Sequence, residues 1–131
     1  AGWQIPTPDM VITMPNPVRV QATGVMGYKH ILVDPGFKED KWVVAAECRP
    51  GARSVVHHII AFVKPPGDHE DSNQSAFERA SSRFLVATAP GAAPMILPPG
   101  TAKLIPAGSQ IVFQMHYTPN GTEQWDQSSV G

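Results

Sequence analysis

The chain has 131 residues, with 10 Lys and Arg against 11 Asp and Glu, so its formal net charge is −1. Such a balance, without a basic block, argues against nucleic acid or an anionic membrane surface as the main partner. The longest apolar runs are far shorter than the roughly 20 residues of a membrane span, so we expect no direct insertion into a membrane. Fourteen Pro and eleven Gly without a period are typical of the many turns of an all-β protein.

The first half of the chain consists of short apolar or alternating stretches, each closed by a turn signal. We expect strands over residues 9–14, 18–22, 28–33, 41–49 and 54–63. The last two of these are joined by Arg-Pro-Gly-Ala-Arg at 49–53, and we expect them to form one long antiparallel hairpin.

The second half contains the one candidate helix. After Pro65-Pro66-Gly67 and an acidic loop, residues 75–83 predict a short helix that Ser72 or Asn73 caps. Residues 88–100 are rich in Pro, Gly and Ala and predict a surface connection. Further strands are expected over 102–105 and 110–117, with a turn at 119–121 before the final segment.

These elements predict an antiparallel β-sandwich of jelly-roll type, with one short helix at most, in which residues 1–131 form a single domain. The beginning, Ala1-Gly2-Trp3, has neither an initiator Met nor a signal peptide, and residues 128–131 resemble the start of a strand. We therefore expect the chain to be a fragment of a longer polypeptide. Its single cysteine, Cys48, excludes an internal disulfide.

Two adjacent histidines, His57 and His58, interrupt the apolar run at 55–63, and His116 lies in a second apolar run at 113–117. An imidazole ring is costly to bury unless its nitrogens find partners, and a metal ion can serve three rings together. We therefore expect His57, His58 and His116 to form one metal site. On a strand at 110–117, alternation places His116 opposite in direction to Met115, which favours His116 as the ligand.

The spacing also bears on the metal. Zinc sites on strands usually use His-x-His, which places both rings on one face, whereas adjacent residues of a regular strand face opposite ways. A His-His pair therefore needs a strand end or a local distortion and suits an ion held at a wide angle. Copper tolerates such low coordination, and imidazole serves both of its oxidation states, so copper is preferred over zinc.

Other interpretations of these side chains remain open. Backbone carbonyls could satisfy the tandem histidines without a metal. A blue-copper site would need a Cys, a His and a Met within one loop, and Cys48 lies nine positions before His57, so Cys48 is expected to be a small buried hydrophobe. His69 is expected in the solvated acidic loop and His30 on a half-buried strand. The chain shows no Gly-rich phosphate loop, Ser/His/Asp order or C-x-x-C pair.

The stretches Val56-His57-His58-Ile59 and Gln114-Met115-His116-Tyr117, with their separation, resemble the N-terminal catalytic-core domain of the copper type II ascorbate-dependent monooxygenases. That family includes peptidylglycine α-hydroxylating monooxygenase and dopamine β-monooxygenase. The flanking residues are most similar to those of bacterial members, namely Glu39 to Val43, Arg49-Pro50-Gly51 and Pro106 to Ser109. The resemblance covers the chain from about Asp9 to Gly131.

The resemblance implies that His57, His58 and His116 hold an electron-transfer copper. In the family, a second β-sandwich domain holds another copper through a His-x-His pair and a Met, and oxygen and substrate react there. Ascorbate, a small-molecule reductant, reduces both coppers, and a substrate C–H bond is hydroxylated. Bacterial relatives carry thioredoxin-like or haem c segments upstream, which implies an extracytoplasmic location, periplasmic or secreted.

This sequence departs from the family pattern because it contains no His-x-His pair and lacks the disulfides of the animal enzymes. We therefore expect a second copper-binding β-sandwich domain after Gly131, and no oxygen-activating site within these residues. Two function classes follow. The first is the electron-transfer domain of a copper monooxygenase, and the second is a non-catalytic copper-binding or structural β-sandwich module or subunit of a larger assembly. A three-histidine zinc hydrolase is a third possibility, which would need an open coordination position and a nearby base.

Overall fold

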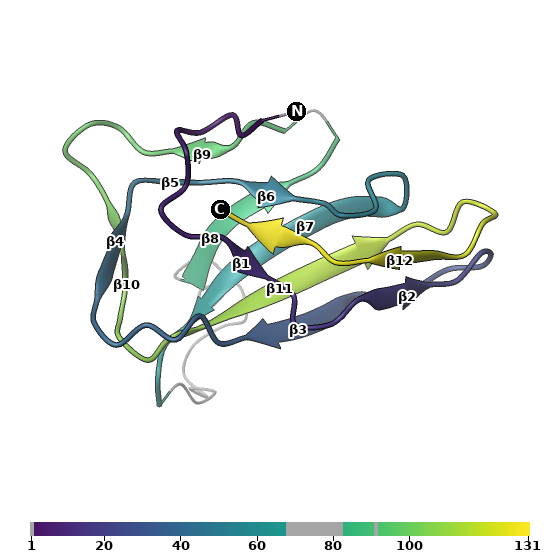
Figure 1. The fold of residues 1–131 in the computed structure, drawn as a ribbon, viewed down its shortest axis with the longest axis horizontal. Coiled ribbons are helices and arrows are strands. Elements are labelled where there is room, and N and C mark those ends of the chain that lie inside the picture. Colours follow the sequence, from purple (N-terminus) through teal and green to yellow (C-terminus); the bar gives the residue numbers. More distant parts are fainter. Residues whose placement is uncertain (1, 68–82, 91) are drawn as a thin grey trace, which may run out of the picture.

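The computed structural model describes residues 2–67, 83–90 and 92–131, and within them nearly all regular structure is antiparallel strand (Figure 1). The strands are β1 (Ile12–Thr13), β2 (Val18–Val20), β3 (Lys29–Val33), β4 (Lys41–Val43), β5 (Ala45–Ala46), β6 (Cys48–Arg49), β7 (Val56–Lys64), β8 (Phe84–Thr88), β9 (Met95–Ile96), β10 (Lys103–Ile105), β11 (Gln110–Tyr117), β12 (Gln124–Asp126) and β13 (Ser129–Val130). The all-β antiparallel class is thus confirmed, and the jelly-roll connectivity stays a prediction.

The largest sheet has four strands in the order β3-β11-β7-β8. A three-stranded sheet, β1-β13-β6, and three two-stranded ribbons, β10-β4, β12-β2 and β5-β9, make up the remaining pairings in the described residues. β7 and β11 are the two longest strands, and they lie side by side along the length of the molecule (Figure 1).

Strict alternation along β11 explains how the large sheet acquires a core face. Ile111, Phe113, Met115 and Tyr117 are buried, while the residues between them are half-buried on the other face. The buried face packs with residues of the smaller sheets, such as Cys48 and Val130, in one hydrophobic cluster. Because burial of each such side chain contributes about 1.5–3 kcal/mol, this cluster fixes which face of β11 turns inward.

The predicted hairpin of residues 41–49 with 54–63 is wrong. The first segment is divided into β4, β5 and β6, which pair with β10, β9 and β13, whereas β7 pairs with β11 and β8. The loop at 50–55 leads from one sheet to another because the Asp126 and Ser128 side chains accept the N–H groups of Ala52 and Gly51. A turn signal in the sequence predicts that the chain reverses, but it does not say which strand will be the partner.

Three further expectations can be compared with the structure. β8 was missed, and the expected surface connection at 88–100 includes β9 and the last residue of β8. The candidate helix at 75–83 lies outside the described residues, apart from Arg83. The final segment forms β13, which pairs with both β1 and β6.

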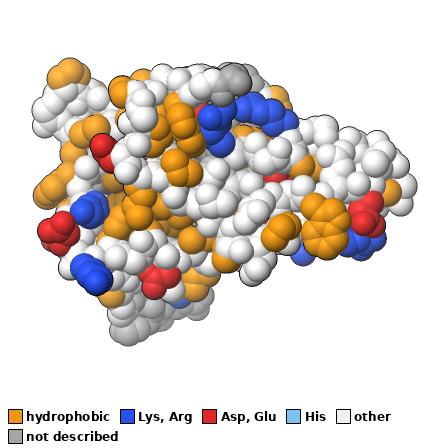
Figure 2. Space-filling view, viewed as in Figure 1, with side chains coloured by type: hydrophobic (Ala, Val, Ile, Leu, Met, Phe, Trp, Pro, Cys, Tyr) orange, Lys and Arg blue, Asp and Glu red, His pale blue; other side chains and the backbone are white. Residues whose placement is uncertain are grey.

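On the face seen in Figure 2, Lys and Arg side chains are interspersed with Asp and Glu, and hydrophobic side chains gather toward the end that holds β4. Exposed large side chains at this end include Met10, Trp42 and Val44. Among the described residues, none forms a helix with the length and apolar character needed to cross a membrane.

Candidate metal centre

The end of β7 that holds the tandem histidines is irregular. His58 pairs with His116, and the next pair joins Val56 to Tyr117, so His57 has no partner on β11. This is a β-bulge, in which two residues of one strand oppose one residue of the other. Val56 and Ile59 are buried, while His57 is exposed and His58 half-buried between them. The bulge therefore turns both histidines away from the core. It is a local distortion of the kind expected for two adjacent histidines on a strand.

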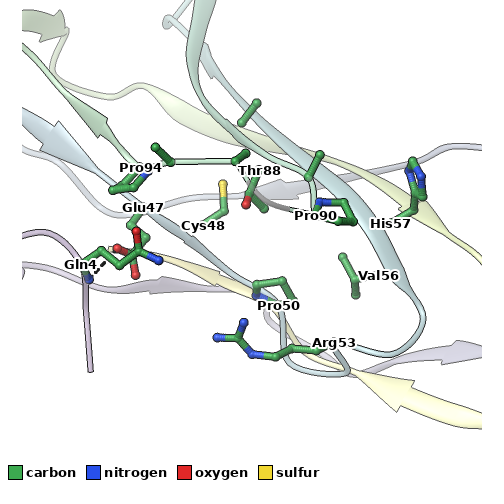
Figure 3. Close-up of a pocket in the computed structure, with 14 residues that line it drawn as sticks. Gln4, Glu47, Cys48, Pro50, Arg53, Val56, His57, Thr88, Pro90 and Pro94 are labelled. Atoms are coloured by element: carbon green, nitrogen blue, oxygen red, sulfur yellow. Dashed lines mark hydrogen bonds between the residues drawn. The ribbon is translucent and has the colours of Figure 1, made fainter. Parts of the chain in front are cut away.

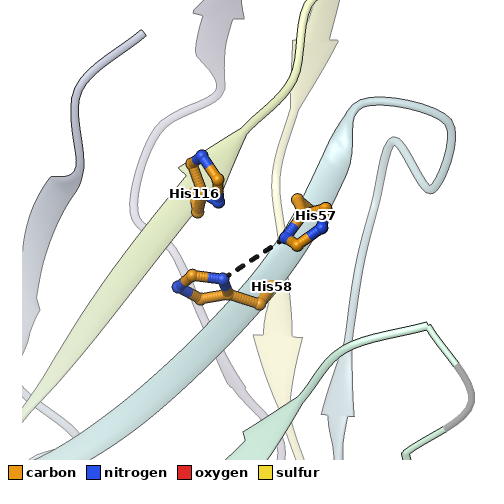
Figure 4. A group of neighbouring side chains, drawn as sticks. All are labelled: His57, His58 and His116. Carbon is orange, nitrogen blue, oxygen red and sulfur yellow. Dashed lines mark hydrogen bonds between the residues drawn. The ribbon is translucent and has the colours of Figure 1, made fainter.

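His116 reaches the same place from β11. Its ring centroid lies 4.9 Å from that of His58 and 5.0 Å from that of His57. Figure 4 shows the three rings gathered at one point beside the two strands. One nitrogen from each ring lies within 4.8 Å of the others, so the three residues could hold a metal ion. In the described part of the chain this is the one group of three or more His, Cys, Asp or Glu with that property.

The hydrogen bonding of the rings is incomplete. Nε2 of His58 and Nδ1 of His116 are buried, and neither has a hydrogen-bond partner among the described residues. Nδ1 of His57 and Nδ1 of His58 face each other at 3.5 Å (Figure 4). The two buried nitrogens therefore form no hydrogen bond with a backbone carbonyl of the described residues. Leaving a buried polar atom without a partner costs about 1–3 kcal/mol, and such atoms in a native protein call for an explanation.

The electrostatics favour rings that are ready to bind a cation. Burial, followed by the nearby His116 and His57, lowers the pKa of His58 below its ordinary value. The neutral imidazole has a free lone pair, and only this form coordinates a metal. Because burial and the two neighbouring rings disfavour a proton on His58, a nitrogen of this ring is left available to an ion.

The donor set and spacing fit a small transition-metal ion. Imidazole–metal bonds are about 2.0–2.1 Å long, so two nitrogens on one ion lie at most about 4.2 Å apart. The three candidate nitrogens lie within 4.8 Å of one another, so a pair at that limit would have to approach by roughly half an ångström. Rotation of the side chain of His57, which is exposed on the bulge, can supply this movement.

The other candidates from the sequence lie elsewhere. Met115 is fully buried on the opposite face of β11, so His116, and not Met115, lies with the other two histidines. Cys48 is a buried core residue outside the group, as expected, and burial and Glu47 raise its pKa to about 12. His30 does lie on a strand, but it is exposed and not half-buried, and its Nε2 is 3.1 Å from Nε2 of Gln114. His69 lies outside the described residues.

The sequence interpretation missed Tyr28. Its ring lies 5.0 Å from His116 and 5.4 Å from His58, at tilted angles. Tyr28 immediately precedes β3, which pairs with β11 in a register that places Gln114 opposite His30. Because this register joins residues more than 80 positions apart, the contact had no local signal in the sequence.

A second polar cluster behind the histidines was also missed. The fully buried Asp126 carboxylate accepts hydrogen bonds from the Tyr117 hydroxyl at 2.7 Å, the Ala52 N–H at 2.8 Å and the Ser128 hydroxyl at 2.9 Å. Burial, and then the bond to Asp126, raises the pKa of Tyr117 well above its usual range. These contacts hold the end of β11, which carries His116, and the loop that leads into β7, which carries His57 and His58.

The same loop approaches β12 and β13 closely. A Cβ atom at Gly51 would lie 2.7 Å from the carbonyl oxygen of Gln127, so a larger residue does not fit there without movement. The Asp126 cluster and this close approach together fix the loop that leads to the bulge.

A scan against protein-family models finds no match for this chain, and a search of curated proteins finds none either. The residues of the centre and their geometry are therefore the evidence for its function.

Proposed function

We propose that His57, His58 and His116 bind a single copper ion, and that this ion transfers electrons within an ascorbate-dependent copper monooxygenase-like protein. The observation that carries the proposal is the convergence of three imidazoles from two strands, two of them with buried nitrogens that have no partner among the residues that the structure describes. Copper bound there would alternate between its cupric and cuprous states and thereby hold one electron.

The ligand chemistry supports copper. All three donors are imidazoles, which suit both copper and zinc, and the affinity of such a site for divalent ions is greatest for copper in the first transition row. No carboxylate or thiolate belongs to the group in the described residues. A zinc hydrolase would need a base beside the metal-bound water, and the group itself supplies none.

The residues of the chain would provide a fixed nitrogen cage. The bulge at His57 presents two rings from one strand, and the pairing of His58 with His116 sets the distance to the third. Tyr28 covers part of the group through its ring contacts with His58 and His116. A cage that changes little between oxidation states transfers electrons with little rearrangement.

The proposal extends to partners, by resemblance. Hydroxylation of a C–H bond would take place at a second copper in another β-sandwich domain, joined to this one through the chain that follows Gly131. The protein would work outside the cytoplasm, with ascorbate or a similar small molecule as the reductant. The alternative is a non-catalytic copper-binding or structural module of a larger assembly, and oxygen consumption by the full-length polypeptide with ascorbate distinguishes the two.

Copper titration of matched variants tests the site. We expect the wild-type chain to bind one equivalent of Cu²⁺ with an electron paramagnetic resonance spectrum that shows nitrogen ligands. His116→Ala should weaken binding at least tenfold, whereas His30→Ala and His69→Ala should leave it nearly unchanged. His30 is the sharper control because it lies on the same sheet, two residues from Tyr28, and is not a member of the group. An equal loss in all three variants would contradict the ligand assignment.

A further inference from the structure

A pocket of about 520 Å³ opens beside the histidine group. It extends from Gln4 and Glu47 at one end to His57 at the other, and Cys48 and Thr88 lie between them (Figure 3). Its volume is within the range of small-molecule sites, which is about 300–1,000 Å³. His57 therefore borders both the candidate metal centre and the pocket.

The two charged side chains of the pocket, Glu47 and Arg53, differ in whether they already form hydrogen bonds within the described part of the protein. Glu47 is almost completely buried, and its Oε1 accepts the backbone N–H groups of Gln4 at 2.8 Å and Ile5 at 3.3 Å. Arg53 is exposed and has no hydrogen bond or ion pair with any described residue. The negative charge is thus engaged by the backbone, and the positive charge remains available to a ligand.

The remaining lining defines the shape and polarity of a suitable ligand. Pro50, Pro90 and Pro94, with several alanines, form rigid apolar walls, and the Thr88 hydroxyl offers a donor and an acceptor. A guanidinium recognises carboxylates and other paired oxygens through two parallel hydrogen bonds. The combination fits a small organic anion with a compact body and hydroxyl groups.

We infer that this pocket binds a small hydroxylated organic anion, with Arg53 holding the anionic group; the guanidinium of Arg53 is directed away from His57, which lies at one end of the pocket (Figure 3). Under the proposed function, on which this role rests, the anion would be an enediol-type reductant. The reductant would give one electron to a bound cupric ion, which would become cuprous, and a hydroxyl proton of the reductant would leave to water. Because His57 belongs both to the pocket lining and to the histidine group, a donor that reaches that end of the pocket would be separated from the ion by one imidazole ring.

Binding to the metal-free chain tests the pocket by itself. Ascorbate is titrated into the metal-free protein under argon, and the heat of binding is measured by calorimetry. We expect saturable binding that Arg53→Gln weakens by about fivefold to tenfold, because a charge-assisted bond is lost at an exposed site. Arg19→Gln is the matched control, since Arg19 is an exposed arginine that pairs with Glu123 outside the pocket. Absence of binding to the wild-type chain, or equal binding by both variants, would overturn the inference.

Reduction kinetics test the reductant role. With the copper-loaded chain, the rate should saturate with ascorbate, and Arg53→Gln should raise the half-saturating concentration by about fivefold to tenfold with little change in the limiting rate. Hexaammineruthenium(II), a cation without oxygen atoms, should reduce both proteins equally fast. A rate that is linear in ascorbate and identical in both proteins would refute the role. Failure of the chain to bind copper would instead refute the proposed function and leave the calorimetric result standing.

Discussion

Two polar clusters, one buried and one partly exposed, lie at the same end of β11, on its opposite faces. Tyr117 points inward to Asp126, whose carboxylate receives hydrogen bonds from two hydroxyls and a backbone N–H. His116, the residue before it, points outward to His57 and His58, where two buried nitrogens have no partner in the described chain. The Asp126 carboxylate is fully hydrogen-bonded within the protein, whereas two nitrogens of the histidine cluster find no partner among the described residues. The histidine cluster could hold a metal ion.

The comparison predicts opposite responses to mutation. Loss of a residue from the Asp126 cluster should destabilise the protein whether or not metal is present, because buried donors lose their acceptor. Loss of a ligand histidine should cost little without metal and should remove the stabilisation that metal brings.

The largest effect is expected for Asp126→Ala. The Tyr117 and Ser128 hydroxyls and the Ala52 N–H would all lose an acceptor in a buried place. At about 1–3 kcal/mol for each unsatisfied group, less what local relaxation recovers, we expect a loss of about 3–5 kcal/mol. Urea unfolding of the metal-free protein measures it. A loss below about 1 kcal/mol would mean that the cluster does not anchor the loop.

The next largest effect is the stabilisation of the folded protein by bound Cu²⁺. A ligand that binds only the folded state stabilises it by about 2.7 kcal/mol at a free concentration one hundred times the dissociation constant. The wild-type chain should gain about this much with Cu²⁺, and His116→Ala at the same copper concentration should gain almost nothing. Without metal, we expect the two proteins to differ by less than about 1 kcal/mol, because the alanine also removes a buried nitrogen that has no hydrogen-bond partner in the described part of the chain. A large loss without metal would show that the histidines stabilise the fold directly.

A smaller change sharpens the distinction between the two faces of β11. Tyr117→Phe removes one hydrogen bond to Asp126 and preserves the ring in the core. We expect a loss of about 1–1.5 kcal/mol in unfolding free energy, with the affinity for copper changed less than threefold. Parallel urea and copper titrations check both values. A tenfold loss of affinity would show instead that the two faces are strongly coupled.

A last prediction concerns the dependence of stability on pH that Cys48 contributes from the core between the sheets. Burial raises the pKa of its thiol to about 12, above its value in the unfolded chain. The folded state therefore disfavours the thiolate, so this contribution to stability is full below about pH 9 and declines as pH rises toward 12. In wild type, stability should fall more steeply over that interval than in Cys48→Ala, as chemical denaturation at a series of pH values would show. Parallel slopes would contradict a buried thiol.

The side-chain directions at the site were more predictable than the strand pairing around it. Alternation along residues 110–117 predicted that His116 and Met115 face opposite ways, because one apolar face decides the direction of every side chain in a regular strand. The adjacent pair at 57 and 58 required a distortion, and the β-bulge provides it. Both conclusions depend on local geometry, which the sequence encodes within a few residues.

The pairing of the strands was harder to predict from the sequence. The segment at 41–49 has the composition of one long strand, but Glu47 binds the N-terminal backbone and exchanges hydrogen bonds with Gly131, and the segment is shared among three sheets. The Asp126 cluster likewise joins residues about 75 positions apart. Such pairings depend on the whole chain, so no local pattern of apolar residues and turns specifies them.

The central claim is that three imidazoles from β7 and β11 close on one ion. Crystals of the copper-loaded protein, measured at the copper absorption edge, test it most directly. We predict a single anomalous peak bonded to one nitrogen from each of His57, His58 and His116, with the Asp126 cluster unchanged behind it. A peak at any other place, or one that the ring of His116 does not reach, would contradict the account.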